Sequence, residues 1–189
     1  MTMLSTEPAK LWLSIQEEAK TEVAKEPCLA SFYHSCIINH SDLKSALSYL
    51  LASKLADDVM SSLLLRELLE KAMDADPQII TAACHDIIAV RKRDPAVVHC
   101  STVLLYLKGF HALQAHRVAH WFWHQGRRSM ALYIQSRVST MCQVDIHPAA
   151  SIGQGVMFDH ATGIVVGETC VIENDVSILQ SVTLGGTGN

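Results

Sequence analysis

An aspartate and a histidine stand side by side near the end of the sequence, at Asp159 and His160, and another aspartate, Asp145, precedes them in the same region. Histidine changes its charge near neutral pH, so it is suited to act as a general base. Such a base needs a carboxylate that fixes its tautomer and stabilises the imidazolium. We therefore predict acid–base chemistry at His160. The alternative is that Asp159-His160 is only a turn pair on the protein surface.

The region that must position these residues, Val144 to Thr187, has a period of six. A period of six is typical of a hexapeptide β-helix, in which each hexad forms one side of a triangular coil. Glycines between the apolar positions allow the chain to turn at the corners. Ordinary strands joined by turns are the alternative. The apolar residues on this spacing are Ile146, Ile152, Phe158, Ile164, Cys170, Val176 and Val182.

The expected length of a coil, about 18 residues, decides which of the candidate residues can meet. Asp145 then falls in the coil next to that of His160, offset by about half a side, which allows but does not require a contact. If this side of the coil is extended, the side chains of Asp159 and His160 point in opposite directions. Asp159 is then better placed to bind a substrate than to orient His160. Cys170 occupies an inward position and is interpreted as a small core residue.

Residues 9 to 140 show helical periodicity, with helices expected from Leu104 to Trp123 and from Arg127 to Ser139. Another helix is expected to start at Asp57-Asp58, and the segment 91–96 is expected to be a loop. The period changes between about Thr140 and Val144. The predicted fold class is therefore α+β, with a helical domain at 1–140 and a parallel β-helix at 141–189.

Composition excludes several classes of protein. The chain has 189 residues, 49% of them hydrophobic, which is enough for a sizeable core. A net charge of −4 predicts no nucleic-acid partner. No apolar run is long enough for a membrane span, and Met1–Lys10 does not resemble a signal peptide. Six cysteines without a CxxC pair suit a reduced, cytoplasmic protein.

Histidines recur on the predicted helix 104–123 and just after it, and His116, His120 and His124 share one face. Histidines four residues apart can chelate zinc. No carboxylate or cysteine lies at a matching position nearby, so we predict no metal site and interpret the histidines as a polar helix face or a contact between subunits.

Three segments resemble the bacterial type of serine O-acetyltransferase, a family of the hexapeptide-repeat acyltransferases. The Asp-His-Ala-Thr-Gly sequence within the second segment is the most specific feature, because hexads alone indicate only the superfamily. The resemblance extends into the helical part, through residues 93–96 and 105–112. The three segments are 145–150, 155–169 and 182–188.

This resemblance implies transfer of an acetyl group from acetyl-CoA to the hydroxyl of L-serine, which forms O-acetyl-L-serine for cysteine biosynthesis. His160 matches the general base of the family and Asp145 the carboxylate that orients it. Asp94 and Asp159 match the carboxylates that hold the amino group of serine. Acetyl-CoA is the implied co-substrate, no metal is implied, and the residues that bind acetyl-CoA are mostly expected beyond residue 189.

The resemblance also implies partners and an assembly. L-cysteine is the expected feedback inhibitor. The chain is expected to form a homo-oligomer, a trimer or a dimer of trimers, with left-handed β-helices around a threefold axis and helical domains that join two trimers into a hexamer. Cysteine synthase is an expected partner only if the C-terminal tail of the family is present. No membrane partner is expected.

The sequence contains seven hexads, about two and a third coils, whereas solenoids usually have at least three repeats and a cap. We therefore expect residues 1–189 by themselves to have little transferase activity. Two alternatives remain: a hexapeptide acyltransferase with another acceptor, and a non-catalytic module that only oligomerises.

Overall fold

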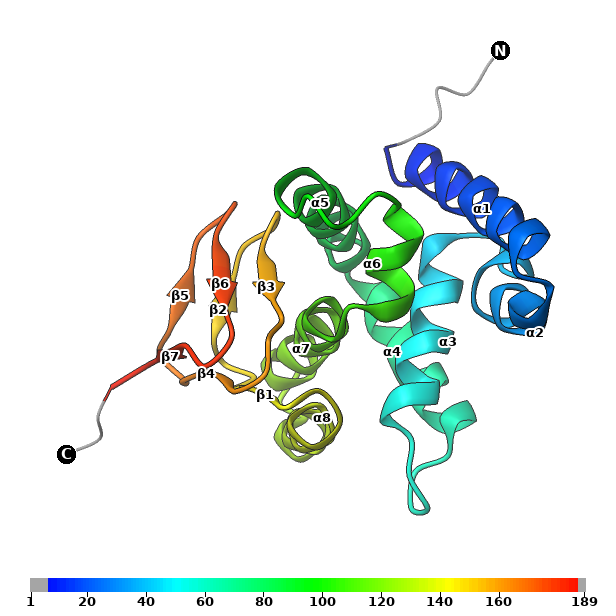
Figure 1. Cartoon of the computed structure of the whole chain (residues 1–189). Coiled ribbons are helices and arrows are strands. Elements are labelled where there is room, and N and C mark those ends of the chain that lie inside the picture. The colour runs from blue at the N-terminus through cyan, green and yellow to red at the C-terminus, as the bar shows by residue number, and fades with distance from the viewer. Residues whose placement is uncertain (1–6, 187–189) are drawn as a thin grey trace, which may run out of the picture.

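The computed structural model describes residues 7–186. Helices occupy the first three quarters of the described chain and pack around one another (Figure 1). The predictions for Met1–Lys10 and for the segment 182–188 lie partly outside the described residues. The helices are α1 (Glu7–Lys25), η1 (Pro27–Leu29), α2 (Ala30–Tyr33), η2 (His34–Ile38), α3 (Leu43–Leu55), α4 (Ser62–Ala75), α5 (Gln78–Arg93), α6 (Cys100–Tyr106), α7 (Lys108–His124) and α8 (Arg128–Cys142).

Asp57 does not start a helix, contrary to the prediction. Its carboxylate accepts hydrogen bonds from the backbone N–H groups of Val59 and Met60, at 2.9 and 2.8 Å, and so closes a turn. The helix begins at Ser62, because the Ser61 hydroxyl accepts a hydrogen bond from a backbone N–H of its first turn. Aspartate favours both turns and helix starts, so its presence alone did not distinguish them.

Two boundaries near the site also differ from the prediction. Helix α5 continues to Arg93, so the basic residues expected in a loop form its last turn. The helix expected from Leu104 to Trp123 is divided, because Leu107 has extended backbone (φ −87°, ψ 106°) between α6 and α7. This break redirects the chain so that α7 starts next to the strands.

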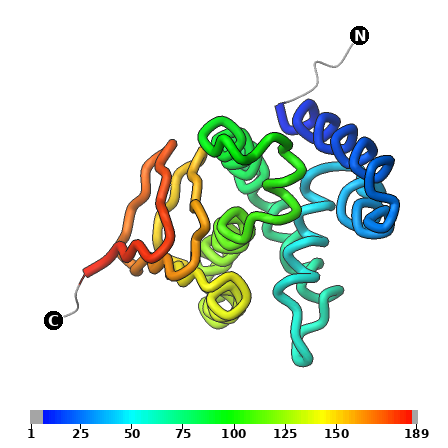
Figure 2. The backbone as a smooth tube through the Cα atoms, viewed as in Figure 1, coloured from blue at the N-terminus to red at the C-terminus, as the bar shows by residue number. Residues whose placement is uncertain are grey.

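After α8 the chain forms short parallel strands that wind into stacked coils, as the period of six predicted. Figure 2 shows these coils, coloured yellow to red, beside the helices. Equivalent sides of successive coils pair in the orders β1-β4-β7, β2-β5 and β3-β6. A parallel β-helix is thereby confirmed. Its strands are β1 (Val144–Ile146), β2 (Ser151–Ile152), β3 (Met157–Asp159), β4 (Ile164–Val166), β5 (Val171–Ile172), β6 (Ser177–Leu179) and β7 (Thr183–Leu184).

The first coil is longer than the expected 18 residues. Val144 pairs with Ile164 and Met157 with Ser177, a spacing of 20 residues in each case (164 − 144 and 177 − 157). Val165 pairs with Thr183, a spacing of 18 (183 − 165). Because strands β1 to β2 and β2 to β3 are spaced as in the next coil, the two additional residues lie in the corner between β3 and β4. That corner contains His160.

The helices and the β-helix share one hydrophobic core. A single cluster of buried apolar side chains extends from Leu11 in α1 to Ile178 in β6. Both Val144 and Ile146 of β1 are buried, as are Ile164 and Val166 of β4, so one side of a coil can bury two apolar residues. None of the described helices combines the length and the hydropathy that a membrane span needs.

Candidate functional site

Three of the four predicted site residues line one pocket. Asp94, Asp159 and His160 border a cavity of about 310 Å³ at the junction between the helices and the first coil. The rest of its wall comes from the end of α5, from β3 and from the α6–α7 junction, at Val90, Met157, Phe158, Tyr106, Leu107, Lys108 and Gly109. The pocket therefore brings together residues that are more than 60 positions apart in the sequence.

Asp94 is fixed at the end of α5 by its neighbours. Its carboxylate accepts a hydrogen bond from the N–H of Ala96 at 2.8 Å, which closes a turn immediately after the helix. The preceding residue, Arg93, donates to the backbone carbonyl of Gly155 at 2.9 Å and to the carboxylate of Asp175 at 3.0 Å. These bonds attach the last turn of α5 to the β-helix and place Asp94 on the same pocket as Asp159.

His160 points toward solvent at the corner after β3. Its side chain is 75% exposed, and its Nε2 lies 3.8 Å from a carboxylate oxygen of Asp159, which is 30% exposed. This separation is too long for a hydrogen bond, so the two groups are neighbours that remain free to contact a third molecule. The corner therefore presents an imidazole and a carboxylate side by side above the pocket.

Asp145 does not line this pocket. It lies in the middle of β1, beside Val165 of β4, and its carboxylate accepts a hydrogen bond from the Gln135 side chain at 2.7 Å. Among residues 7–186 no hydrogen bond joins Asp145 to His160. The pairing of these two residues therefore stays a prediction. The longer first coil changes their offset from the one that a strict period of six predicts.

Lys108 and Gly109 were not predicted as site residues, yet they form part of the pocket wall. The Lys108 ammonium donates a hydrogen bond to the hydroxyl of Thr162. A Cβ atom added to Gly109 would lie 2.2 Å from the carbonyl oxygen of Phe158, so only glycine allows α7 to approach the strand this closely. An isolated glycine within a helical pattern was the signal for this contact.

Of the four histidines of α7, His111 and His116 are buried in the core, whereas His124 is exposed. Burial lowers the pKa of His116 to about 3, and burial also lowers the pKa of His111 to about 4. Burial also lowers the pKa of His120, whose Nδ1 lies 2.8 Å from the carbonyl oxygen of Pro148. Within the described part of the chain, no group of three or more His, Cys, Asp or Glu residues is arranged to hold a metal ion.

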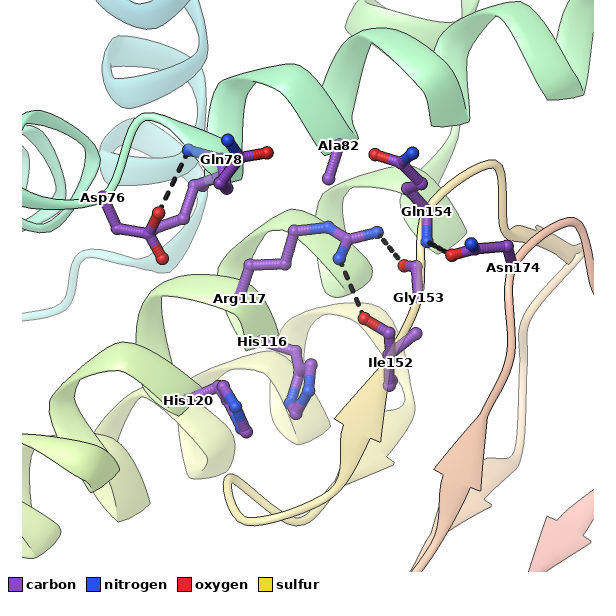
Figure 3. Close-up of a pocket in the computed structure, with 11 residues that line it drawn as sticks. Asp76, Gln78, Ala82, His116, Arg117, His120, Ile152, Gly153, Gln154 and Asn174 are labelled. Carbon is purple, nitrogen blue, oxygen red and sulfur yellow. Dashed lines mark hydrogen bonds between the residues drawn. The ribbon is translucent and has the colours of Figure 1, made fainter.

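A second pocket, of about 280 Å³, lies where α5 and α7 meet the corner of the β-helix that follows β2 (Figure 3). Arg117 crosses its floor and donates to the carbonyl groups of Ile152 and Gly153, at 3.2 and 2.8 Å. The same guanidinium lies 2.7 Å from the carboxylate of Asp86. These polar groups already bond the helices to the β-helix, so we interpret this pocket as part of the contact between the two and not as a binding site.

A helical part followed by a parallel β-helix of short sides, with an Asp-His pair at the junction, defines a hexapeptide-repeat protein. Residues 11–115 match the protein family described as "Serine acetyltransferase, N-terminal". Serine acetyltransferase of Escherichia coli (strain K12) is 62% identical over 178 residues, which cover 94% of this chain and 65% of that protein. The chain belongs to the serine acetyltransferase family.

Solved structures agree with this assignment. A serine acetyltransferase in complex with CoA superposes with a TM-score of 0.94 at 60% identity, over 95% of this chain and 76% of that one. A serine acetyltransferase in complex with cysteine superposes with a TM-score of 0.93 at 61% identity, over 95% of this chain and 74% of that one. The chain spans about two thirds of the length of the curated relative from E. coli, 65%.

Proposed function

We propose that the protein transfers the acetyl group of acetyl-CoA to the hydroxyl of L-serine, which yields O-acetyl-L-serine and CoA. The observation that carries this proposal is the meeting of Asp94, Asp159 and His160 at one pocket. Two carboxylates suit an ammonium group, and a neighbouring imidazole suits the hydroxyl of the same small substrate. Membership of the serine acetyltransferase family supports the choice of acceptor and donor.

In the proposed mechanism the Asp94 and Asp159 carboxylates bind the serine ammonium. The His160 imidazole takes the proton of the serine hydroxyl while its oxygen attacks the thioester carbonyl of acetyl-CoA. The C–S bond then breaks, and the CoA thiolate receives the proton from the imidazolium. Each of these steps conserves charge, and the enzyme returns to its starting state without a covalent intermediate.

Asp145 is proposed to orient His160 and to stabilise the imidazolium, as a carboxylate does in a catalytic triad. In the single chain its described partner is Gln135. The role therefore requires a rearrangement of one of the two side chains, or a contribution from a neighbouring copy.

The proposed partners follow from the family and from the surface. A relative bound to cysteine supports L-cysteine as an inhibitor that occupies the serine site. Homo-oligomerisation is supported by apolar side chains exposed on the β-helix at Val165, Val171 and Leu179. All six cysteines are free, which supports a reducing compartment such as the cytoplasm. Binding of cysteine synthase through a C-terminal tail is proposed from the family alone.

The test is a thiol-release assay with acetyl-CoA and L-serine. The assay compares residues 1–189 with a protein of the full length of its relatives. In the active form, we expect His160→Ala to lower kcat by about 10²- to 10⁴-fold, because general-base catalysis contributes that much. Asp94→Asn and Asp159→Asn should mainly raise the KM for L-serine. The matched control is Asp58→Asn, an exposed aspartate outside the pocket. Unchanged turnover in His160→Ala, or preference for a different acceptor, would contradict the proposal.

A further inference from the structure

The corner that carries His160 has an unusual backbone. It contains two residues more than the equivalent corner of the next coil, between β6 and β7. His160 and Ala161 both have left-handed backbone, with φ of 55° and 64°. The N–H of Ala161 bonds to the carbonyl of Asp159 at 2.6 Å, and the N–H of Thr162 bonds to the carbonyl of His160 at 2.9 Å.

Each of these bonds spans only two residues, the pattern of a γ-turn, and γ-turns with positive φ are rare and strained. Alanine does not favour this conformation, and histidine adopts it only uncommonly. Consecutive strained residues persist only where surrounding structure holds them. The corner between β6 and β7, which is shorter, has left-handed backbone only at Ser181 among its residues before β7. The conformation at His160 therefore needs a specific support.

The support comes from the first turn of α7. Ala161 is fully buried, and a Cβ added to Gly109 would lie 3.0 Å from its methyl group. The Lys108 ammonium bonds to the hydroxyl of Thr162, the residue that ends the second γ-turn. Bonds between coils hold the other side of the corner: the N–H of Gly163 donates to Gln143, and the N–H of Ser181 donates to Thr162, each at 2.8 Å.

We propose that Lys108 and Gly109 are positioning residues for His160. Gly109 brings α7 into contact with the corner, and Lys108 bonds the corner to that helix, so the backbone of His160 is held where its side chain borders the pocket. The break at Leu107 between α6 and α7 serves the same arrangement, since α7 could not otherwise begin at this point. This inference rests on the proposed function for its catalytic consequence, but the positioning itself can be measured without turnover.

The test uses the active, full-length form and the variants Lys108→Met, Lys108→Arg and Gly109→Ala. Lys108→Met should lower kcat for L-serine by about 10- to 100-fold, because a small misplacement of a catalytic group has an effect of that size. The KM for acetyl-CoA should stay the same, and Lys108→Arg should restore most of the rate. Lys71→Met, at an exposed lysine of α4, is the matched control and should behave as wild type.

A second measurement does not depend on activity. Crystal structures of wild type and Lys108→Met should show that the positive φ angles at His160 and Ala161 are lost or become heterogeneous only in the variant. If kcat falls while both φ angles stay the same, Lys108 acts on the substrate directly and the positioning role is wrong. Unchanged kcat and φ in Lys108→Met would also overturn it. If the wild-type protein releases no CoA with L-serine, the proposed function is wrong, and the φ angles alone decide whether Lys108 positions His160.

Gly109→Ala provides independent evidence. The added methyl group should displace β3 or α7, because the carbonyl of Phe158 occupies its place. If Gly109→Ala folds with the melting temperature of wild type and retains its kcat, then close approach of α7 does not position His160. If it fails to fold, the Lys108 variants still test the inference.

Discussion

At the scale of single residues, two buried histidines make the stability of the helical core depend on pH. His111 and His116 are 2% and 4% exposed. Burial lowers the pKa of both, to about 4 and about 3, because the charged imidazolium is poorly solvated in the core. His111 also places Nε2 2.7 Å from the carbonyl of Leu104, a hydrogen bond that suits the neutral ring. Both side chains are therefore neutral in the folded protein at neutral pH.

The folded protein should lose stability as pH falls below about 6.5, the value for histidine in an unfolded chain. The pKa of each group is depressed by folding, so its contribution is present above 6.5 and is lost as pH falls toward the folded values, about 4 and about 3. Each histidine should lower the free energy of unfolding by about 1.4 kcal/mol per pH unit in this window. Urea unfolding between pH 7.5 and 4.5 measures the slope.

The variant that checks this assignment is His116→Gln, which should reduce the slope by about 1.4 kcal/mol per pH unit. The matched control is His34→Gln, at an exposed position of η2, which should leave the slope as in wild type. Equal slopes in wild type and His116→Gln would show that His116 takes up its proton without unfolding.

The sequence predicts those site residues whose side-chain chemistry is distinctive. It misses those whose role depends on where the fold places them. Asp94, Asp159 and His160 were predicted from the resemblance and from the chemistry of their side chains, and the structure brings them together. Lys108 carries no such signal, because its role depends on where α7 begins. The role of Asp145 stays a prediction, since its place relative to His160 depends on the length of the first coil, which the period of six does not give.

At the scale of elements, periodicity predicted the types of element but not their register. The period of six remains visible although the first coil has 20 residues, because each side of a coil has apolar residues at two positions. The two additional residues lie in the corner of His160, which packs against the first turn of α7. The division at Leu107 was missed for a related reason: the helical pattern continues across it, and only the contact with β3 explains the break.

The ion pair of Asp86 and Arg117 joins elements across the two parts of the chain. Asp86 is fully buried, and its two oxygens accept hydrogen bonds from Arg117, from Gln114 and from the N–H of Val156. Arg117 in turn holds the corner after β2. The pair therefore satisfies donors from α7 and from the β-helix at once. Burial makes such a pair costly to break, because the remaining charge has no solvent to compensate it.

Asp86→Asn should lower the free energy of unfolding by about 3 kcal/mol, since it leaves the Arg117 charge uncompensated in the interior. Denaturant unfolding at neutral pH measures the loss, and Asp58→Asn is the exposed control. The double variant Asp86→Leu with Arg117→Met should recover part of the loss, because it removes both charges. A loss below about 1 kcal/mol in Asp86→Asn, the size typical of an exposed pair, would contradict this account.

At the scale of the whole molecule, the helices and the β-helix share their interior. One buried apolar cluster crosses from α1 to β6, and the polar contacts of Arg93 and Arg117 run along the same junction. The division of the chain into domains at 1–140 and 141–189 stays a prediction from the change of period. Domains that fold alone have their own cores and are joined by few contacts. The shared core instead favours a single cooperative unit.

Three tryptophans allow this to be measured. Trp12 is buried in α1, whereas Trp123 at the end of α7 packs its ring 5.0 Å from that of His147, after β1. A variant that keeps only Trp12 reports on the helical end, and Trp12→Phe leaves signals from Trp121 and Trp123 at the junction. In each variant, we expect the tryptophan fluorescence to change in urea at the same midpoint as the far-UV circular dichroism, because the core is continuous. Each midpoint is compared with wild type to correct for the substitutions. If the junction signal changes at lower urea than the Trp12 signal, the β-helix unfolds by itself and the chain behaves as two domains.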